Sequence, residues 1–377
     1  MRWRLAAAGT LIGLALCELL LRLAGPWLPV DLTTRALQEL HPVYGVFHRP
    51  GASAWIRDPE FKTFVRFNRE GLRGPEIPSS PAPGVTRVLV LGDSFVEGAE
   101  AEEDQTLPSV MAKRLTEAGF AAEALNGGVR GWGTAQEYLY LTDQGLALHP
   151  DIVVLVLYVG NDLVDNSVEL SGLAPDGTFS RPFFVLDRGQ LVQLPAILAL
   201  ASAIDPLLHV ARSHFTLVNF LESAVAVRLA YADRAEVLRS VHRLVFADPP
   251  PTQWEQAWAV TEAVVVAIQE ATDAHSIRFL LVAAPHKAQL DATEWDRLVR
   301  GSPPPEGTAW NARLPQQRLV ELAARHNIHS LDLLPTLQEA ATLGPLFFAQ
   351  NSHWTALGHQ AAATAIARAI SNRASHE

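Results

Sequence analysis

The chain has 377 residues, of which 49% are hydrophobic and 19% are charged, so it can bury the core of one large domain or two smaller ones and is not a disordered chain. Its formal net charge of −10, with no cluster of Lys and Arg, disfavours a nucleic-acid partner. The single cysteine, Cys17, excludes a disulfide or a cysteine-based metal site within one chain.

The first thirty residues differ in composition from the rest of the chain. Arg2 and Arg4 precede an apolar run that Glu18 and Arg22 interrupt. Basic residues before an apolar run are typical of a signal anchor, and no convincing small-residue cleavage site follows. We therefore expect residues 1–30 to form an uncleaved single-pass membrane anchor that places the remaining chain in the periplasm. A cleaved signal, or an amphipathic helix packed on the domain, is the alternative.

The segment that follows, residues 31–85, is rich in Pro and Gly and predicts a lead-in with short extended patches, for example at 63–68. After it, apolar runs alternate with helical spacing. Strands are expected at 87–94, 121–128 and 151–162, and helices at 106–119 and 134–150. This alternation predicts an α/β fold with a parallel sheet flanked by helices, in which ligands bind beyond the carboxyl ends of the strands.

Residues 163–250 interrupt the alternation and predict an insertion or cap, with a hairpin candidate at 181–195. The α/β pattern then resumes. Helices are expected at 252–276 and 309–327, strands at 278–285 and 328–335, and a loop followed by a helix at 351–370.

Polar residues follow several of the expected strands. Ser94 lies just after the first strand, where a serine is commonly a helix N-cap, and His353 lies in the loop before the last helix. A serine nucleophile needs a histidine to take its proton and donors for the developing oxyanion. The side-chain amide of Asn161 and the backbone N–H groups of Gly131 and Ser94 are candidate donors, although Gly131 and Asn161 would each pass as ordinary turn residues.

Four stretches taken in order resemble the blocks of the SGNH, or GDSL-type, hydrolases: LGDSFVEG, NGGVRGWGT, VGND and NSHWTALGH. The resemblance implies that Ser94 is the nucleophile, His353 the base, and Gly131 and Asn161 the oxyanion residues. It also implies a flavodoxin-like three-layer α/β/α sandwich and acyl-ester chemistry without a metal or other cofactor.

The resemblance covers about residues 86–162 and 278–370. It predicts an SGNH-type domain over 86–372 that carries the insertion at about 163–250.

One position departs from the family pattern. An aspartate normally precedes the histidine by two or three residues, and here those positions hold Asn351 and Gln350. The side-chain carbonyl of Asn351 can accept the Nδ1–H of His353 but supplies no negative charge. The arrangement is therefore Ser-His-Asn, a Ser-His dyad, a site oriented by a backbone carbonyl or by another acid such as Asp332, or a site of weakened activity.

Carboxyl and amide residues beside these four stretches can have purely structural roles. We expect Asp93 and Asp162 to bond loop amides. Asp165 and Asn166 either line the pocket or cap the next segment.

Two further pairs are ambiguous. Trp132 and Trp354 flank the expected cleft, where their rings would either stack on a sugar or pack in the core. His286 and Lys287 follow a strand at the edge suited to substrate contact, or belong to an ordinary surface loop.

The sequence therefore predicts a membrane-anchored serine esterase acting outside the cytoplasm on an ester, such as the O-acetyl groups of a cell-surface glycan. Two alternatives stay open. One is an O-acyltransferase acting on extracytoplasmic polysaccharide, and the other is a catalytically weak glycan-binding or assembly protein. The sequence does not indicate the oligomeric state.

Overall fold

A five-stranded parallel sheet forms the centre of the protein, for which the computed structural model describes residues 2–24, 37–172, 181–194, 207, 210–212, 214–221, 242–300 and 302–374. The strands are β5 (Thr86–Gly92), β6 (Ala122–Gly128), β7 (Ile152–Tyr158), β11 (Arg278–Ala284) and β13 (Ser330–Asp332). Their spatial order is β13-β11-β7-β5-β6, with every neighbouring pair parallel. This is the strand order of flavodoxin-like sheets, so the fold class expected from the sequence is confirmed.

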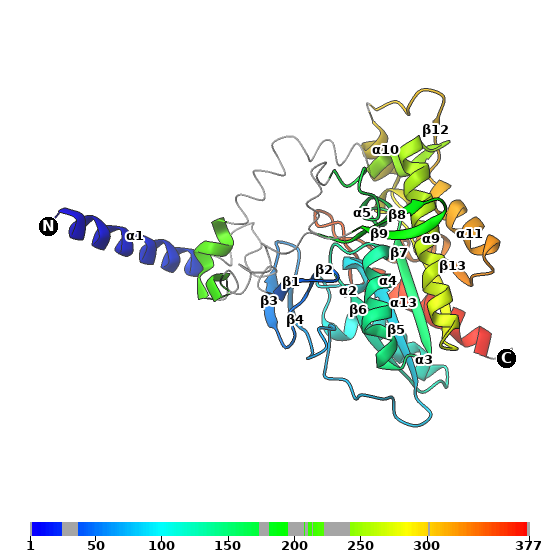
Figure 1. Ribbon diagram of the computed structural model, residues 1–377, viewed down its shortest axis with the longest axis horizontal. Coiled ribbons are helices and arrows are strands. Elements are labelled where there is room, and N and C mark those ends of the chain that lie inside the picture. Colours follow the sequence, from blue (N-terminus) through cyan, green and yellow to red (C-terminus); the bar gives the residue numbers. More distant parts are fainter. Residues whose placement is uncertain are drawn as a thin grey trace.

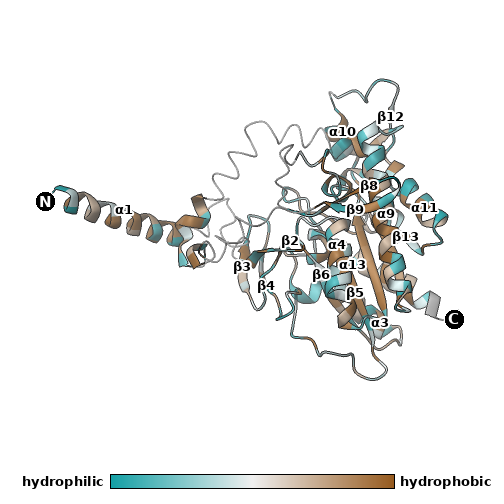
Figure 2. Ribbon diagram, in the orientation of Figure 1, coloured by the Kyte–Doolittle hydropathy of each residue, from teal (hydrophilic) through white to brown (hydrophobic). Residues whose placement is uncertain are grey.

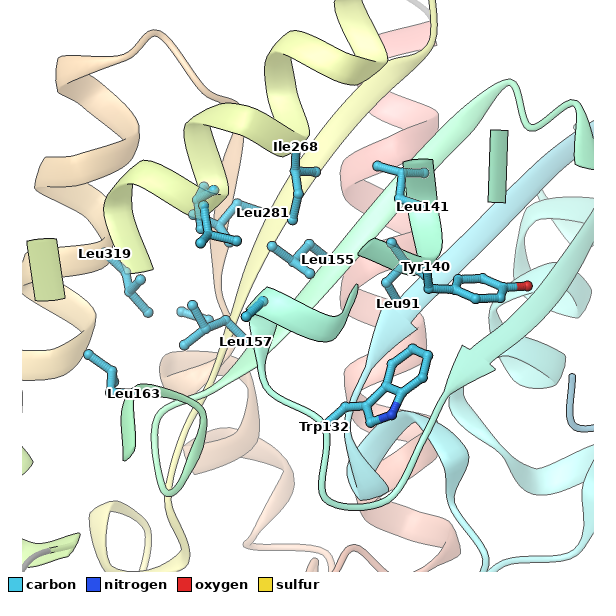
Figure 3. Close-up of a cluster of buried hydrophobic side chains, with 14 of the residues drawn as sticks. Leu91, Trp132, Tyr140, Leu141, Leu155, Leu157, Leu163, Ile268, Leu281 and Leu319 are labelled. Atoms are coloured by element: carbon cyan, nitrogen blue, oxygen red, sulfur yellow. The ribbon is translucent and has the colours of Figure 1, made fainter. Parts of the chain in front are cut away.

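The central strands are buried on both faces because their apolar residues face two separate cores. Leu89 and Leu155 point into one core and Val90 and Val154 into the other, as the alternation of side chains along a strand requires. Figure 3 shows the first core, where leucines of the strands meet Tyr140 and other helical side chains.

Helices cover each core. The first core is closed by α4 (Thr134–Asp143), α9 (Thr252–Asp273) and α11 (Leu314–Arg325). The second is closed by α3 (Leu107–Glu117), α12 (Leu334–Ala340) and α13 (Ala356–Ala374). The result is a three-layer α/β/α sandwich.

Several helix limits differ from the expected ones. The helix expected at 134–150 ends at Asp143 and continues only as a 3₁₀ turn, Gly145–Leu148. The helix expected from 309 begins at Leu314, because Pro315 suits the first turn of a helix and not its interior. Other short elements are α2 (Ser94–Glu97), α5 (Asp162–Asp165), α10 (Ala292–Val299), β10 (Ala247–Asp248) and β12 (Ala309–Trp310).

The described part of the lead-in forms two antiparallel hairpins. They are β1 (Gln38–His41) with β2 (Gly45–His48), and β3 (Ser53–Arg57) with β4 (Lys62–Arg66). The lead-in is docked on the sandwich by two contacts. The backbone of Arg73 forms an isolated antiparallel β-bridge with Asn126 of β6, and the Val46 carbonyl accepts a hydrogen bond from the Trp132 ring.

The N-terminal helix α1 (Arg2–Ala24) extends away from the sandwich (Figure 1). It is long and apolar enough to cross a membrane, and its side chains are not buried in the protein. Figure 2 shows that apolar residues predominate along it, as they do in the central strands. A signal sequence has the same properties.

Near the end of α1, Glu18 and Arg22 lie four residues apart and form an ion pair at 2.7 Å. The Glu18 carboxylate also accepts the N–H groups of Thr216 and Leu217 from the insertion.

The hairpin expected in the insertion is formed by β8 (Phe183–Asp187) and β9 (Gln190–Leu194). The part of the insertion between that hairpin and residue 242 lies largely outside the described residues.

Candidate active site

Ser94 is the first residue of α2, directly after β5. The preceding Asp93 is the N-cap, and its carboxyl accepts the N–H of Phe95 at 2.8 Å. Ser94 itself therefore does not act as the cap, and its side chain is turned toward another partner. The serine is 7% exposed and lies at the carboxyl end of the sheet, the edge where such folds bind ligands.

The structure brings Ser94, His353 and Asn351 into one hydrogen-bonded series. His353 Nε2 lies 2.8 Å from Ser94 Oγ, and His353 Nδ1 lies 2.5 Å from Asn351 Oδ1. Because an amide oxygen only accepts, Nδ1 carries the proton and Nε2 presents its lone pair to the serine hydroxyl. This is the tautomer that a general base requires.

The loop that carries Asn351 and His353 is held from outside. Glu60, in the lead-in hairpin, accepts the backbone N–H groups of Ala349, Gln350 and Asn351 at 2.7–2.9 Å. Between Asn351 and His353, Ser352 adopts a left-handed backbone with φ 67°, which is uncommon outside glycine. The interactions with Glu60 therefore fix a loop that contains a strained residue.

Burial lowers the pKa of His353 below its usual value, and the nearby Glu100 carboxylate acts in the opposite direction. The imidazole is consequently neutral near pH 7. A neutral ring is the form that can take a proton from Ser94.

Gly131 has a positive φ of 78°, and a Cβ on it would meet open space. The adjacent Arg130 donates its backbone N–H to the buried Glu97 carboxylate at 2.7 Å. Burial alone would raise the pKa of Glu97, but the Arg130 charge, His48 and this N–H together lower it to about 2. The loop that contains Gly131 is thus anchored by a carboxylate to α2, the helix that begins at Ser94.

Asn161 lies at the end of β7, where its Nδ2 donates to Asp165 at 2.9 Å, and Arg181 binds the same carboxylate at 2.6 Å. Burial and the charges of Asp165 and Glu97 raise the pKa of the nearby Asp93 carboxyl to about 7, and the Asn161 amide acts in the opposite direction. Asn161 therefore lies close to the N-cap of α2. Its role as an oxyanion donor stays a prediction.

Two neighbours of Asn161 have structural partners. Asp162 is buried and accepts the N–H of Tyr158 at 2.8 Å, as expected of a residue that bonds a loop amide. Asn166 is buried between α4 and α9, where it bonds Ala135 N–H and the hydroxyl of Thr261. Asn166 is thus a cross-link between helices and does not line a pocket.

Both tryptophans belong to the core. Trp132 is 0% exposed and packs against Tyr44 and Phe47, and Trp354 is 0% exposed and packs against Phe95. Their rings cannot stack on a sugar without unpacking the domain, so core packing is the correct alternative.

Asp332 does not replace the missing aspartate. Its carboxylate pairs with Arg313 at 3.3 Å and accepts the N–H of Leu334 at 2.9 Å. These contacts at the end of β13 occupy both of its oxygens.

An open cavity of about 390 Å³ adjoins the histidine loop. Its lining includes Ser352 and is rich in cations: Arg243, Lys287, Arg297 and Arg300. His286 lines it too, but the His286 Nδ1 accepts the N–H of Ala288, and burial lowers the pKa of this histidine to about 4. Lys287 donates to the carbonyls of Phe348 and Ala349, so it also supports the histidine loop.

The sequence did not reveal Glu60, Arg73, Glu97 or Glu100 as site residues. Arg73 is buried and donates to the carbonyls of Glu97, Gly98 and Ala101. In the sequence these residues look like ordinary loop charges. Burial sets Arg73, Glu97 and Glu100 apart, whereas Glu60 is partly exposed and is set apart only by its contacts with the histidine loop. Within the part of the chain that the structure describes, no group of three or more His, Cys, Asp or Glu is placed to hold a metal ion.

Comparison with known proteins adds a family match. Residues 248–377, the part that carries the His353 loop, match the family model described as SGNH hydrolase-like domain, acetyltransferase AlgX. No curated protein matches the chain.

Several solved structures resemble the chain at low identity. A putative lipolytic protein of the G-D-S-L family from Desulfitobacterium hafniense is 12% identical, with a TM-score of 0.37, over 75% of this chain and 99% of that one. A catalytic mutant of Axe2, an acetylxylan esterase from Geobacillus stearothermophilus, is 13% identical, with a TM-score of 0.41, over 76% and 94%. The protein TesA is 13% identical, with a TM-score of 0.40, over 76% and 98%. At these TM-scores the likenesses carry no argument about activity.

Proposed function

We propose that this chain, which belongs to the SGNH/GDSL-type hydrolases, is a membrane-anchored serine esterase whose catalytic domain works outside the cytoplasm. The observation that carries the proposal is the 2.8 Å contact between Ser94 Oγ and His353 Nε2, with Asn351 on the opposite nitrogen of the ring. In this division of the chain, residues 1–30 are the anchor, 31–85 the lead-in, and 86–372 the catalytic domain with its insertion at about 163–250.

The proposed reaction begins as His353 Nε2 takes the proton of Ser94 Oγ while that oxygen attacks the ester carbonyl carbon. The carbonyl oxygen becomes an oxyanion that accepts hydrogen bonds from the N–H groups of Ser94 and Gly131 and from the Asn161 amide. The imidazolium then gives its proton to the departing alcohol oxygen, and the carbon–oxygen bond to that alcohol breaks. An acyl group remains on Ser94.

The second half repeats these steps with a new nucleophile. Water gives up a proton to His353 and attacks the acyl carbon, which releases the carboxylic acid and restores the Ser94 hydroxyl. The same residues act in both halves, so the enzyme needs neither a metal nor another cofactor for this reaction.

We propose O-acetyl groups of a cell-surface glycan as the substrate class. The exposed apolar helix α1 supports a location at the membrane, where such glycans are found. The transferase alternative, in which a sugar hydroxyl replaces water, is favoured by one observation. The family model that matches the His353 part of the chain is described as an acetyltransferase.

The test uses the full chain in detergent micelles with p-nitrophenyl acetate, with and without a glycan acceptor. We expect release of p-nitrophenol and an intact-mass increase of one acetyl group that disappears in Ser94→Ala. Ser80→Ala, on an exposed loop, is the matched control. Acetate as the product indicates the esterase, and acetylated glycan indicates the transferase.

Two results would contradict the enzymatic proposal. One is a rate of p-nitrophenol release by the Ser94→Ala variant that equals the rate of the wild-type chain. The other is glycan affinity that survives both Ser94→Ala and His353→Ala without any turnover, which would favour the glycan-binding alternative.

A further inference from the structure

The Nδ1 side of His353 faces a second group besides Asn351. Glu100 Oε1 lies 3.4 Å from His353 Nδ1. Glu100 comes from the loop after α2, six residues beyond the nucleophile, and not from the segment before the histidine. Its side chain is 0% exposed, so water does not screen its charge from the ring.

The two oxygens of Glu100 are not equally satisfied. Oε1 pairs with Arg130 Nη2 at 2.9 Å, whereas Oε2 is buried without a hydrogen-bond partner among the described residues. If Glu100 served only the ion pair with Arg130, an arrangement with both carboxylate oxygens bound to the guanidinium would be more stable. Glu100 instead keeps one oxygen between Arg130 and the imidazole.

The backbone around Glu100 is fixed on both sides. Arg73 donates to the carbonyls of Gly98 and Ala101, and the Thr63 hydroxyl donates to the carbonyl of Ala99. Gly98 has a left-handed φ of 62°, and a Cβ there would come within 2.8 Å of the His359 ring. The backbone that carries the Glu100 side chain is therefore held in one position.

From this geometry we propose that Glu100 is the positioning residue that supplies the negative charge for His353, while Asn351 only orients the ring. The two functions of the family's usual aspartate are thus divided between an amide oxygen and a carboxylate from another loop. The proposal rests on the proposed esterase function, because it concerns the histidine of that same site.

The charge balance around the ring explains why the loss of Glu100 would matter. Three charged groups act on His353: Glu100 and Glu97 favour its positive form and Arg130 opposes it, and His359 lies close to the same ring. Glu100 also faces Arg73 and Arg130, and His48 pairs with Glu97. Arg130 opposes a positive imidazole at His353, and Arg73 is the second buried cation that faces Glu100. Without Glu100, the imidazolium formed during proton transfer would face these cations with less compensation.

The test compares Glu100→Gln, Glu100→Asp, Asn351→Asp and the double variant Glu100→Gln/Asn351→Asp in the full chain. Glu102→Gln is the matched control, since Glu102 is exposed and its side chain makes no capping hydrogen bond. We expect Glu100→Gln to lower kcat for p-nitrophenyl acetate by about 10- to 100-fold with little change in KM. The acid limb of kcat/KM should move down by roughly one pH unit, because a positive ring becomes less favourable.

Rescue separates charge from packing. Glu100→Asp should retain part of the rate, and Asn351→Asp in the Glu100→Gln background should restore most of it by placing a carboxylate at the other acceptor position. A purely structural role of Glu100 predicts lower activity with an unmoved acid limb and no rescue, and this result would overturn the proposal.

A direct titration distinguishes failure of this inference from failure of the proposed function. NMR titration of the His353 ring, assigned with His353→Ala, reports its pKa whether or not the chain turns over an ester. A lower pKa in Glu100→Gln than in wild type supports the contact even in an inactive protein. An unchanged pKa in a folded Glu100→Gln variant refutes it even if the esterase proposal holds.

Discussion

The loops at the end of the sheet and the lead-in hairpins contribute to the site in different ways. The loops carry the groups proposed to react, Ser94 and His353, which meet at 2.8 Å. The lead-in carries no reacting group, yet Glu60 holds the histidine loop by three backbone N–H groups and Arg73 holds the loop after the nucleophile by three carbonyls.

This difference shows that the sandwich alone does not complete the site. A parallel sheet brings strand ends to one edge, but it does not fix the loops that leave that edge. Here a segment that precedes the sheet in sequence does so, by binding the backbone of two loops with charged side chains. Reacting residues and positioning residues are therefore separable by mutation.

The largest effect is expected on the reacting side. His353→Ala removes the base, and we expect kcat for p-nitrophenyl acetate to fall by about 10³-fold or more without a loss of folding. His275→Ala, in the exposed turn just after α9, is the control in the same assay. A rate within tenfold of wild type would mean that another group takes the Ser94 proton.

Arg73→Lys tests the lead-in through stability. Lysine keeps the charge but cannot reach three carbonyls with a planar fork, so buried acceptors lose their donors. We expect the free energy of unfolding to fall by about 2 kcal/mol, measured by thermal or denaturant unfolding. Arg69→Lys, an exposed ion-pair residue, should change it little. Equal free energies of unfolding for the two variants would show that the three carbonyl contacts of Arg73 do not stabilise the protein.

Glu60→Gln tests the same region through activity. A neutral amide cannot accept three backbone N–H groups as well as a carboxylate, so the loop that carries Asn351 and His353 loosens. We expect kcat to fall about tenfold through misplacement of the ring, with KM nearly constant. Glu76→Gln, also in the lead-in but exposed, should match wild type. A change in KM alone would place Glu60 in substrate binding instead.

The smallest effect concerns pH. Because burial lowers the pKa of His353, the ring stays neutral as the pH falls through the usual histidine range, and activity is lost only below it. We expect kcat/KM to change little between pH 8 and 6.5 and to decline at lower pH. A decline that begins above pH 6.5 would mean that the pKa is raised and that the charge near Nδ1 outweighs burial.

Much of the fold was predictable because its signal is local. The apolar runs at β5, β7 and β11 and the helical spacing of α3 and α9 identify these elements within a residue or two at most boundaries. Ser94, His353 and Asn351 were also found from sequence, and the structure brings them together, although their roles remain predictions. The oxyanion roles of Gly131 and Asn161 are likewise untested.

The rest left no local signal. Glu60 acts on backbone groups almost 290 residues away, and the acidic run that contains Glu100 reads as a solvated loop. Trp132 and Trp354 lie next to site residues in sequence, but their side chains turn into the two cores. Such outcomes depend on long-range packing, which neither propensity nor spacing encodes.

The separation of 259 residues between Ser94 and His353 has a consequence for biosynthesis. At ribosomal speeds, synthesis of that stretch takes on the order of tens of seconds, during which the proposed nucleophile has been made and the proposed base has not. Glu60 is likewise synthesised long before the loop whose backbone N–H groups it accepts. The contact between Ser94 and His353 can therefore form only after the late-synthesised loop docks against the early one, so the nascent chain lacks the proposed catalytic pair throughout this period.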